Sequence, residues 1–215
     1  MCRLLAITAN RPIDAAVHLR AFADLARRSR EYQGHGWGCA WREGDAWRTY
    51  HSIRPIWEDD VERAGRVKVL VAHARSAFRD EGIDVENNMP FVAGELAFVF
   101  NGELRGVRIA EQGRIGAEKL FRFLARQGAA SSEAGMRSAV RLVSQRTRYI
   151  RAMNVVIAGG GRFVACSVFN EDEEYFTLRR RREEGVDVIC SETYGEREGW
   201  VPLANGAVQE IRWYS

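Results

Sequence analysis

The order of apolar patterns constrains the fold of this chain more than any other feature. Strand-like runs rich in apolar and β-branched residues fill both ends, and two amphipathic helical patterns, at 117–124 and 136–143, follow each other between them. Adjacent helices between blocks of strands indicate sheets covered by helices, an α+β architecture, rather than a repeat of β-α-β units. The 215 residues, 46% of them hydrophobic, suffice for one domain spanning 1–215.

Local signals divide the chain further. Residues 2–8 have strand character, and Asn10 followed by Pro12 predicts the start of a helix with an apolar stripe. A Ser at 131 or 132 predicts the start of the last helix, and the run Arg179–Arg182 is interpreted as a solvated turn. Further strands are expected at 36–41 and 46–53 as a hairpin, at 67–73 and 95–100, and from 153, 162, 174, 186 and 207, with a polar loop at 78–89.

Composition narrows the class of partner. Lys and Arg total 32 against 29 for Asp and Glu, a balance too even for a dedicated nucleic-acid binder. The four cysteines are far apart, without the spacing of a zinc site or a disulfide scaffold, which favours free thiols in a reducing cytosol. No apolar run approaches the roughly 18 residues of a membrane span, and the N-terminal run is too short for a secretory signal. We therefore expect a cytoplasmic protein that acts on a small molecule without a metal or cofactor.

Cys2 directly follows Met1. Removal of Met1 would give Cys2 both a thiol and a free α-amine. An α-amine with a pKa of about 7.7 to 8.0 is partly unprotonated at neutral pH. It would accept the thiol proton and return it to the leaving nitrogen, so that nucleophile and base belong to one residue.

Short motifs accompany Cys2 in a fixed order. They are MCRLLAI at 1–7, GHGWGCAW at 34–41, AHARSA at 72–77, ENNMPF at 86–91, FVFNGEL at 98–104, ICSETYG at 189–195 and WVPLANGAVQEI at 200–211. In this order and at these separations they resemble the class II glutamine amidotransferases, which are N-terminal-nucleophile hydrolases, and especially their compact single-domain members. The resemblance covers most of the chain and implies a four-layer αββα sandwich.

The resemblance also implies roles for single residues. Cys2 would attack the side-chain amide of glutamine or a γ-glutamyl compound to form a thioester. Asn101, through its side-chain amide, and Gly102, through its backbone N–H, would form the oxyanion hole, although the Asn-Gly pair alone would be interpreted as a turn. Arg75 would bind the substrate α-carboxylate through a bidentate interaction.

Three further residues lie in or next to these motifs. Asn87 and Asn88 are expected to line the substrate pocket. His73 is interpreted as a packed residue at a strand end and not as a general base, because the α-amine already supplies that function.

The chain departs from the family pattern at three positions. His35 stands where the family usually has Asp, and Met89 where it usually has His. Gly116 replaces an Asp that in many members holds the glutamine α-ammonium, a loss on the order of 2 to 5 kcal/mol unless another acid such as Glu118 or Glu192 substitutes. The third departure favours a modified or larger γ-glutamyl donor over free glutamine.

The sequence thus predicts an amidohydrolase that releases ammonia or an amine from a γ-glutamyl amide. If the ammonia has an acceptor, a separate synthase subunit must provide the site for it. An alternative is a catalytically quiet binding or regulatory subunit, which the loss at Gly116 favours and the joint presence of Cys2, Arg75 and the Asn101-Gly102 pair disfavours. A metal or nucleic-acid protein is the least favoured interpretation.

Overall fold

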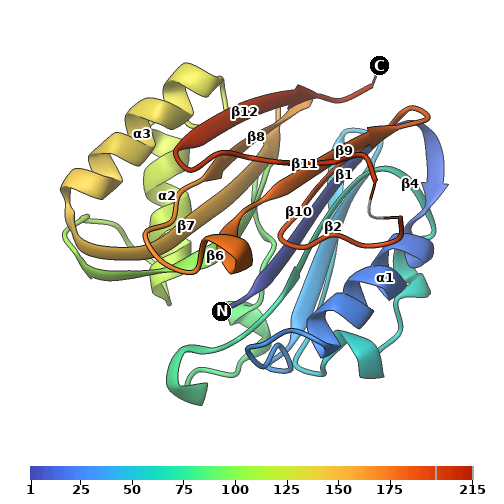
Figure 1. Ribbon diagram of the computed structural model, residues 1–215, viewed down its shortest axis with the longest axis horizontal. Helices are drawn as coiled ribbons and strands as arrows, with labels where there is room; N and C mark the ends of the chain where they lie inside the picture. Colours follow the sequence, from blue (N-terminus) through green and yellow to red (C-terminus); the bar gives the residue numbers. More distant parts are fainter. Residues whose placement is uncertain (197, 215) are drawn as a thin grey trace.

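Two antiparallel sheets lie face to face, with helices on their outer surfaces (Figure 1). A computed structural model describes residues 1–196 and 198–214. The seven-stranded sheet has the order β11-β9-β10-β1-β4-β2-β3, and the five-stranded sheet has the order β12-β8-β7-β6-β5. This is the α+β sandwich that the resemblance implied.

The bounds of the elements are as follows. The larger sheet contains β1 (Arg3–Asp14), β2 (Trp37–Glu43), β3 (Ala46–Ser52), β4 (Arg66–Ala74), β9 (Arg179–Glu183), β10 (Val186–Cys190) and β11 (Trp200–Pro202). The smaller sheet contains β5 (Phe91–Ala93), β6 (Leu96–Val107), β7 (Thr147–Gly159), β8 (Arg162–Ser167) and β12 (Ala207–Arg212). The helices are α1 (Ala15–Arg27), α2 (Gly116–Arg126), α3 (Glu133–Gln145) and the short α4 (Glu173–Phe176), and 3-10 turns occur at Ile56–Glu58, Glu62–Ala64, Phe78–Asp80 and Val85–Asn87.

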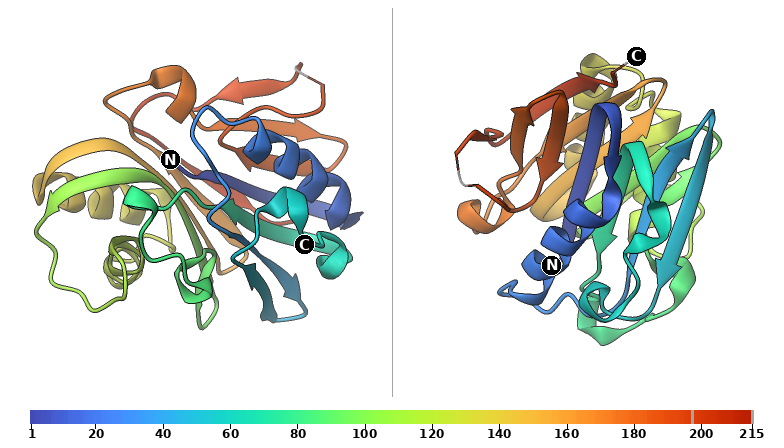
Figure 2. Two further views of the ribbon diagram at one scale, coloured as in Figure 1. Left: turned by 90° about the horizontal axis from the view of Figure 1, so that it is seen from below. Right: turned by 90° about the vertical axis from the view of Figure 1, so that its right-hand side faces the viewer.

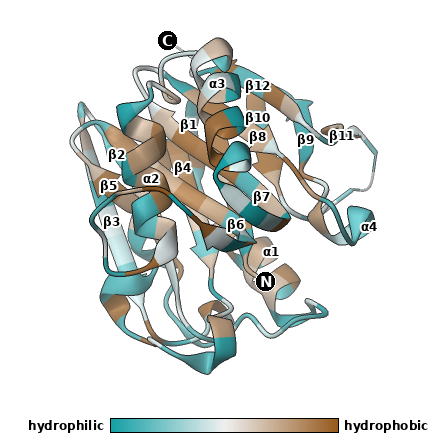
Figure 3. Cartoon of the chain, turned by 90° about the vertical axis from the view of Figure 1, so that its left-hand side faces the viewer, coloured by the Kyte–Doolittle hydropathy of each residue, from teal (hydrophilic) through white to brown (hydrophobic). Residues whose placement is uncertain are grey.

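Strand β1 is buried on both faces and places the N-terminus inside the sandwich. Leu4 and Ala6 join the core between the sheets, whereas Leu5 and Ile7 pack with α1 on the outer face. This alternation follows from the period of two in a strand. Figure 3 shows the apolar character of β1 and β4 in the middle of the molecule.

Helices cover the outer surface of each sheet (Figure 2). Helix α1 packs on the seven-stranded sheet, and α2 and α3 pack on the five-stranded sheet, where the rings of Phe98 and Phe121 stack with centroids 5.0 Å apart. The Ser132 side chain caps α3 by accepting a hydrogen bond from Gly135 N at 3.1 Å, as the sequence predicted. The resulting layer order is helix, sheet, sheet, helices.

The structure corrects three local predictions. The first helix begins at Ala15 with Asp14 as its N-cap, and Asn10 and Pro12 belong to β1, because Asn10 N donates to Gly185 O at 2.9 Å and continues the sheet. Residues 173–176 form α4 rather than a strand. The run Arg179–Arg182 lies in β9, where pairing with β10 and β11 holds it extended.

The remaining elements agree with the sequence. The expected hairpin is β2 and β3, and the expected loop at 78–89 has only short 3-10 turns. Within the described residues, no helix is long and apolar enough to cross a membrane.

Candidate active site

Cys2 lies immediately before β1, beside the end of β4. Because Arg3 pairs with Ala74, Cys2 faces the segment that continues from β4. Ser76 N donates to the Cys2 Sγ atom at 3.3 Å, and Ser76 O lies 3.6 Å from the same sulfur. Two central strands therefore hold the thiol in place.

The local charges act on the Cys2 thiol in opposite directions. Burial raises its pKa, and the N-terminal ammonium, the Ser76 hydrogen bond and the Arg75 guanidinium lower it without cancelling the effect of burial. The thiol is therefore protonated at neutral pH, and a base is needed to activate it.

Arg75 is a buried cation next to Cys2, only 7% exposed. Its Nη2 donates to Gly82 O at 2.7 Å, and its Nη1 donates to Asn88 Oδ1 at 3.4 Å. Among residues 1–196 and 198–214, no carboxylate lies within 4.0 Å of its guanidinium. Burial lowers the pKa of Arg75, and the charges of Cys2 and Asp84 oppose that shift. A buried guanidinium held only by neutral groups favours an anionic ligand.

Asn87 and Asn88 support the loop around Arg75. Asn88 Nδ2 donates to Ser52 O at 2.7 Å, which fixes the amide whose oxygen accepts from Arg75. Asn87 Nδ2 donates to Gly82 O at 3.1 Å, and its buried Oδ1 has no hydrogen-bond partner in the described part of the chain. The structure thus brings both amides to the Arg75 side of the site.

Asn101 lies within β6, not in a turn. It pairs with Asn154 of β7, and its side chain is fully buried. Neither Oδ1 nor Nδ2 of Asn101 has a hydrogen-bond partner among the described residues. An unpartnered buried amide is costly, of order 1–3 kcal/mol, so its persistence points to a ligand.

Gly102 follows in the same strand, where the neighbouring backbone leaves no room for a side chain. A Cβ atom built on it would lie 2.1 Å from Ala152 O. Glycine is therefore required here by the close approach of β7. Ala152 belongs to a small apolar cluster that also contacts Met1, which places Gly102 near the N-terminus.

His73 connects the two sheets and is neutral. Its Nε2–H donates to Phe100 O at 3.1 Å, and burial followed by the Arg75 charge lowers its pKa to about 3. This agrees with the prediction that His73 is a packed residue. Because His73 pairs with Leu4 and bonds the residue before Asn101, it places the oxyanion candidate beside the start of β1.

The residues around Met1 were not singled out by the sequence. The Met1 ammonium forms an ion pair with Glu31, and its carbonyl oxygen accepts hydrogen bonds from Gln33 Nε2 and, at 3.0 Å, from the Tyr175 hydroxyl. These residues come from the loop after α1 and from α4, so no spacing along the chain could have indicated them.

The departures from the family pattern have structural consequences. His35 Nδ1 accepts from Ala77 N at 2.9 Å and so supports the segment after Arg75, and Met89 is buried in the core between the sheets. Glu118 is bound by Arg114 and Arg122, and the Arg114 backbone N–H makes the largest contribution to lowering its pKa to about 2.

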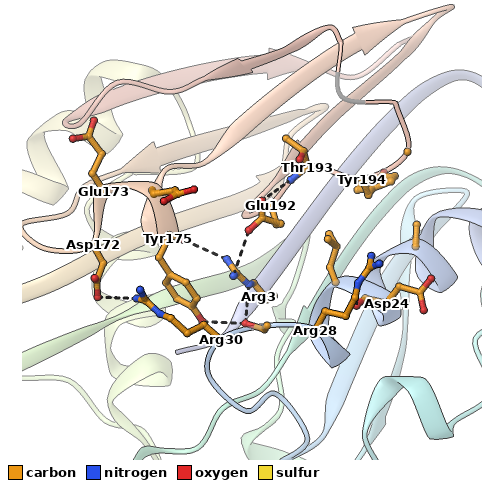
Figure 4. A pocket seen from close by; sticks show the side chains of 15 residues that line it. Arg3, Asp24, Arg28, Arg30, Asp172, Glu173, Tyr175, Glu192, Thr193 and Tyr194 are labelled. Atoms are coloured by element: carbon orange, nitrogen blue, oxygen red, sulfur yellow. Dashed lines mark hydrogen bonds and ion pairs between the residues drawn. The ribbon is translucent and has the colours of Figure 1, made fainter.

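A cavity of about 780 Å³ lies between α1, α4 and the segment that follows β10 (Figure 4). Arg3 lies over the Tyr175 ring at 4.1 Å and forms an ion pair with Glu192 at 3.5 Å. Cys2 does not line this cavity, but Tyr175, which bonds the Met1 carbonyl oxygen, does. Both Glu118 and Glu192, the acids considered as replacements at Gly116, are therefore already paired with arginine.

Known proteins share this fold. A family model described as "Glutamine amidotransferases class-II" matches residues 1–182. A glutamine aminotransferase class-II domain protein from Silicibacter pomeroyi has 18% identity and a TM-score of 0.65, covering 99% of each chain. A predicted glutamine amidotransferase from Pseudomonas aeruginosa has 17% identity and a TM-score of 0.63, covering 99% of this chain and 98% of that one.

A longer enzyme has the same fold over part of its length. Glutamine phosphoribosylpyrophosphate amidotransferase from B. subtilis has 15% identity and a TM-score of 0.63, and the match covers all of this chain and 49% of that one. No curated protein matches the sequence.

Proposed function

The chain belongs to the class II glutamine amidotransferases, whose chemistry is hydrolysis or transfer of the glutamine amide group, and from this premise we propose that it hydrolyses substituted γ-glutamyl amides with Cys2 as nucleophile. The observation that carries the proposal is the buried Arg75 guanidinium, which has no carboxylate within 4.0 Å among the described residues, beside the half-buried Cys2 thiol. A γ-glutamyl group has an α-carboxylate at one end and the reacting amide at the other, so it can engage both residues.

The reaction begins after Met1 is removed. The Cys2 α-amine takes the thiol proton, and the sulfur attacks the amide carbon. The C–N bond breaks as the leaving nitrogen receives that proton, which leaves a thioester. Water then adds to the thioester carbon, the C–S bond breaks, and the thiol regains a proton. The products are glutamate and ammonia or an amine.

Asn101 and Gly102 would stabilise the oxyanion of each tetrahedral intermediate. The Asn101 amide has an unpartnered buried donor, Nδ2, so no existing hydrogen bond must be broken to receive the developing charge. A preorganised donor of this kind typically contributes a factor of about 10² to 10³ in kcat.

The substrate is expected to differ from free glutamine. Gly116 offers no carboxylate to a substrate ammonium, and Glu118 and Glu192 are engaged by arginine. A donor whose recognition depends on its leaving group compensates for that loss. A separate synthase subunit remains a proposed acceptor of the released ammonia.

The first test is intact-mass spectrometry before and after treatment with a diazoketone analogue of glutamine. We expect loss of Met1 and addition of one label. Cys2→Ala should remove the label, whereas Cys39→Ala should keep it, because burial raises the pKa of Cys39 to about 12 and makes that thiol inert.

The outcomes separate two functions. A processed chain that takes up no label and hydrolyses no γ-glutamyl amide would contradict the proposal and favour the binding-subunit alternative. Label that persists in Cys2→Ala would show that another residue is the nucleophile.

A further inference from the structure

Met1 occupies an enclosed space beside Cys2. Its side chain is 11% exposed and packs against Ala152, Phe169, Tyr175 and Phe176. The walls of this space do not depend on Met1. The strands and α4 that form them are held by their own hydrogen bonds, such as the one that Asn154 Nδ2 donates to Phe176 O.

The chemistry of the proposed reaction fixes what this space would hold. The leaving nitrogen must receive a proton from the Cys2 α-amine, so it lies within hydrogen-bond distance of that nitrogen. Any group that the leaving nitrogen carries must extend beyond the amine. Met1 is bonded to the same nitrogen and fills that region, about one residue length of 3.8 Å from Cys2.

Carboxylates and cations form a network around this space. Arg151 lies near four carboxylates, with distances of 3.1 Å to Glu31, 3.8 Å to Glu103, 3.5 Å to Glu171 and 2.9 Å to Asp172. Arg30 adds a second guanidinium, 3.0 Å from Asp172. Arg105 adds a third, 2.5 Å from Glu103, and the Met1 ammonium, which Glu31 binds, is a fourth cation at this group. Loss of Met1 therefore leaves four carboxylates against three guanidiniums, an excess of one negative charge.

Two neutral donors complete the lining. Gln33 Nε2 and the Tyr175 hydroxyl both bond the Met1 carbonyl oxygen, and Gln33 is fully buried. Gln33 Nε2 also donates to Glu31 O at 2.8 Å, and the Tyr175 hydroxyl lies 3.2 Å from Ser29 Oγ, so after loss of Met1 each group keeps a partner and can bond a further acceptor. The space therefore offers a carboxylate, two donors and an apolar wall to one small group.

We propose that the space filled by Met1 becomes the leaving-group subsite. It selects γ-glutamyl amides whose leaving group carries a positively charged amino group in addition to the amide nitrogen. The inference rests on the proposed function, because it concerns the same reaction. Two carbons separate the Met1 ammonium from the Cys2 nitrogen, so we expect a spacing of two to three carbons between the leaving nitrogen and the second cation.

A matched pair of substrates tests the subsite. The γ-glutamyl 2-aminoethylamide and the γ-glutamyl propylamide differ only in a terminal ammonium or methyl group. With protein shown by mass to lack Met1, we expect kcat/KM for the aminoethylamide to exceed that for the propylamide by about tenfold or more, the size of a charge-assisted hydrogen bond.

Variants locate the source of the preference. Glu31→Gln should reduce the ratio of the two kcat/KM values to within about twofold of one, because the partner of the second cation is neutral. Glu171→Gln also removes a carboxylate partner of Arg151, but not one that binds the Met1 ammonium, so the ratio of the two kcat/KM values should persist. Calorimetric binding of both amides to Cys2→Ala gives the same comparison without turnover.

Each result has a defined meaning. Equal kcat/KM for the two amides, or a preference that survives in Glu31→Gln, would overturn the subsite while leaving γ-glutamyl hydrolysis intact. If neither amide nor glutamine is hydrolysed and Cys2 takes no label, the proposed function fails first and the subsite fails with it.

Discussion

The two sides of Cys2 differ in their charged groups. On one side, the buried Arg75 guanidinium is held by the neutral oxygens of Gly82 and Asn88. On the other, Glu31 belongs to a group of acids that surround Arg151. A γ-glutamyl amide with a cationic leaving group would match both sides. The comparison teaches that the proposed nucleophile lies where two differently charged environments meet.

The two sides also differ in how their charges are held. Arg75 is fixed by a backbone carbonyl and a side-chain amide, so its full charge is available to a ligand. Glu31 shares its charge with Arg151 at 3.1 Å, and the Met1 ammonium is its other partner. Burial raises the pKa of Glu31, but these two cations outweigh burial and lower it. We therefore expect stronger recognition on the Arg75 side.

Removal of the Asn101 amide, the proposed oxyanion donor, should lower kcat more than any other change and by the same factor for all substrates. Asn101→Ala should lower kcat by about 10² to 10³ for every substrate, with KM changed little, because the oxyanion exists only during reaction. Steady-state kinetics on the two matched amides measures this. Asn154→Ala, in the neighbouring buried amide, is the control, and an equal loss there would indicate a packing effect.

Removal of the Arg75 guanidinium, the proposed partner of the substrate α-carboxylate, should weaken recognition only on the Arg75 side. Arg75→Gln should lower kcat/KM by roughly 30-fold to 10³-fold, equivalent to about 2 to 4 kcal/mol. The preference between the aminoethylamide and the propylamide should stay the same. The exposed Arg79→Gln serves as control. A collapsed preference in Arg75→Gln would show that the two sides are not independent.

The pH profile tests whether the Cys2 α-amine, which lies between the two sides, is the base. With the α-amine as base, kcat/KM should rise about tenfold per pH unit below its pKa of about 7.7 to 8.0 and then level off. His73, with its pKa lowered to about 3, is neutral throughout this range and should add no inflection. An inflection near pH 6 to 7 that disappears in His73→Gln would assign the base to His73 instead.

The smallest effect is expected from the Tyr175 hydroxyl on the Met1 side. Tyr175→Phe should lower kcat/KM for γ-glutamyl glycinamide relative to the propylamide by about three- to tenfold, because a neutral hydrogen bond contributes about 0.5–1.5 kcal/mol. Tyr194→Phe, a distant tyrosine bonded to His18, is the control. An unchanged ratio would remove Tyr175 from leaving-group recognition.

Local sequence patterns predicted the strands and helices well where no distant segment changed the local hydrogen bonding. The β2–β3 hairpin and the Ser132 cap of α3 were predicted, whereas the cap at Asn10 was wrong because Asn10 bonds Gly185 from a distant hairpin. The Asn101-Gly102 pair has the composition of a turn, but pairing with β7 holds it extended. Local propensity was overridden wherever a distant strand supplied hydrogen bonds.

By itself the apolar periodicity of the sequence indicated sheets covered by helices, and the ordered motifs around Cys2 predicted the sandwich and proposed the nucleophile, since neither signal needs a distant contact to be recognised. Only the tertiary structure decided the charge of each side of the site. Glu31, Arg151 and Tyr175 come from a loop, a strand and a short helix. Their contacts depend on how the layers pack, because electrostatic interactions are set by distance in space and by burial, not by separation along the chain.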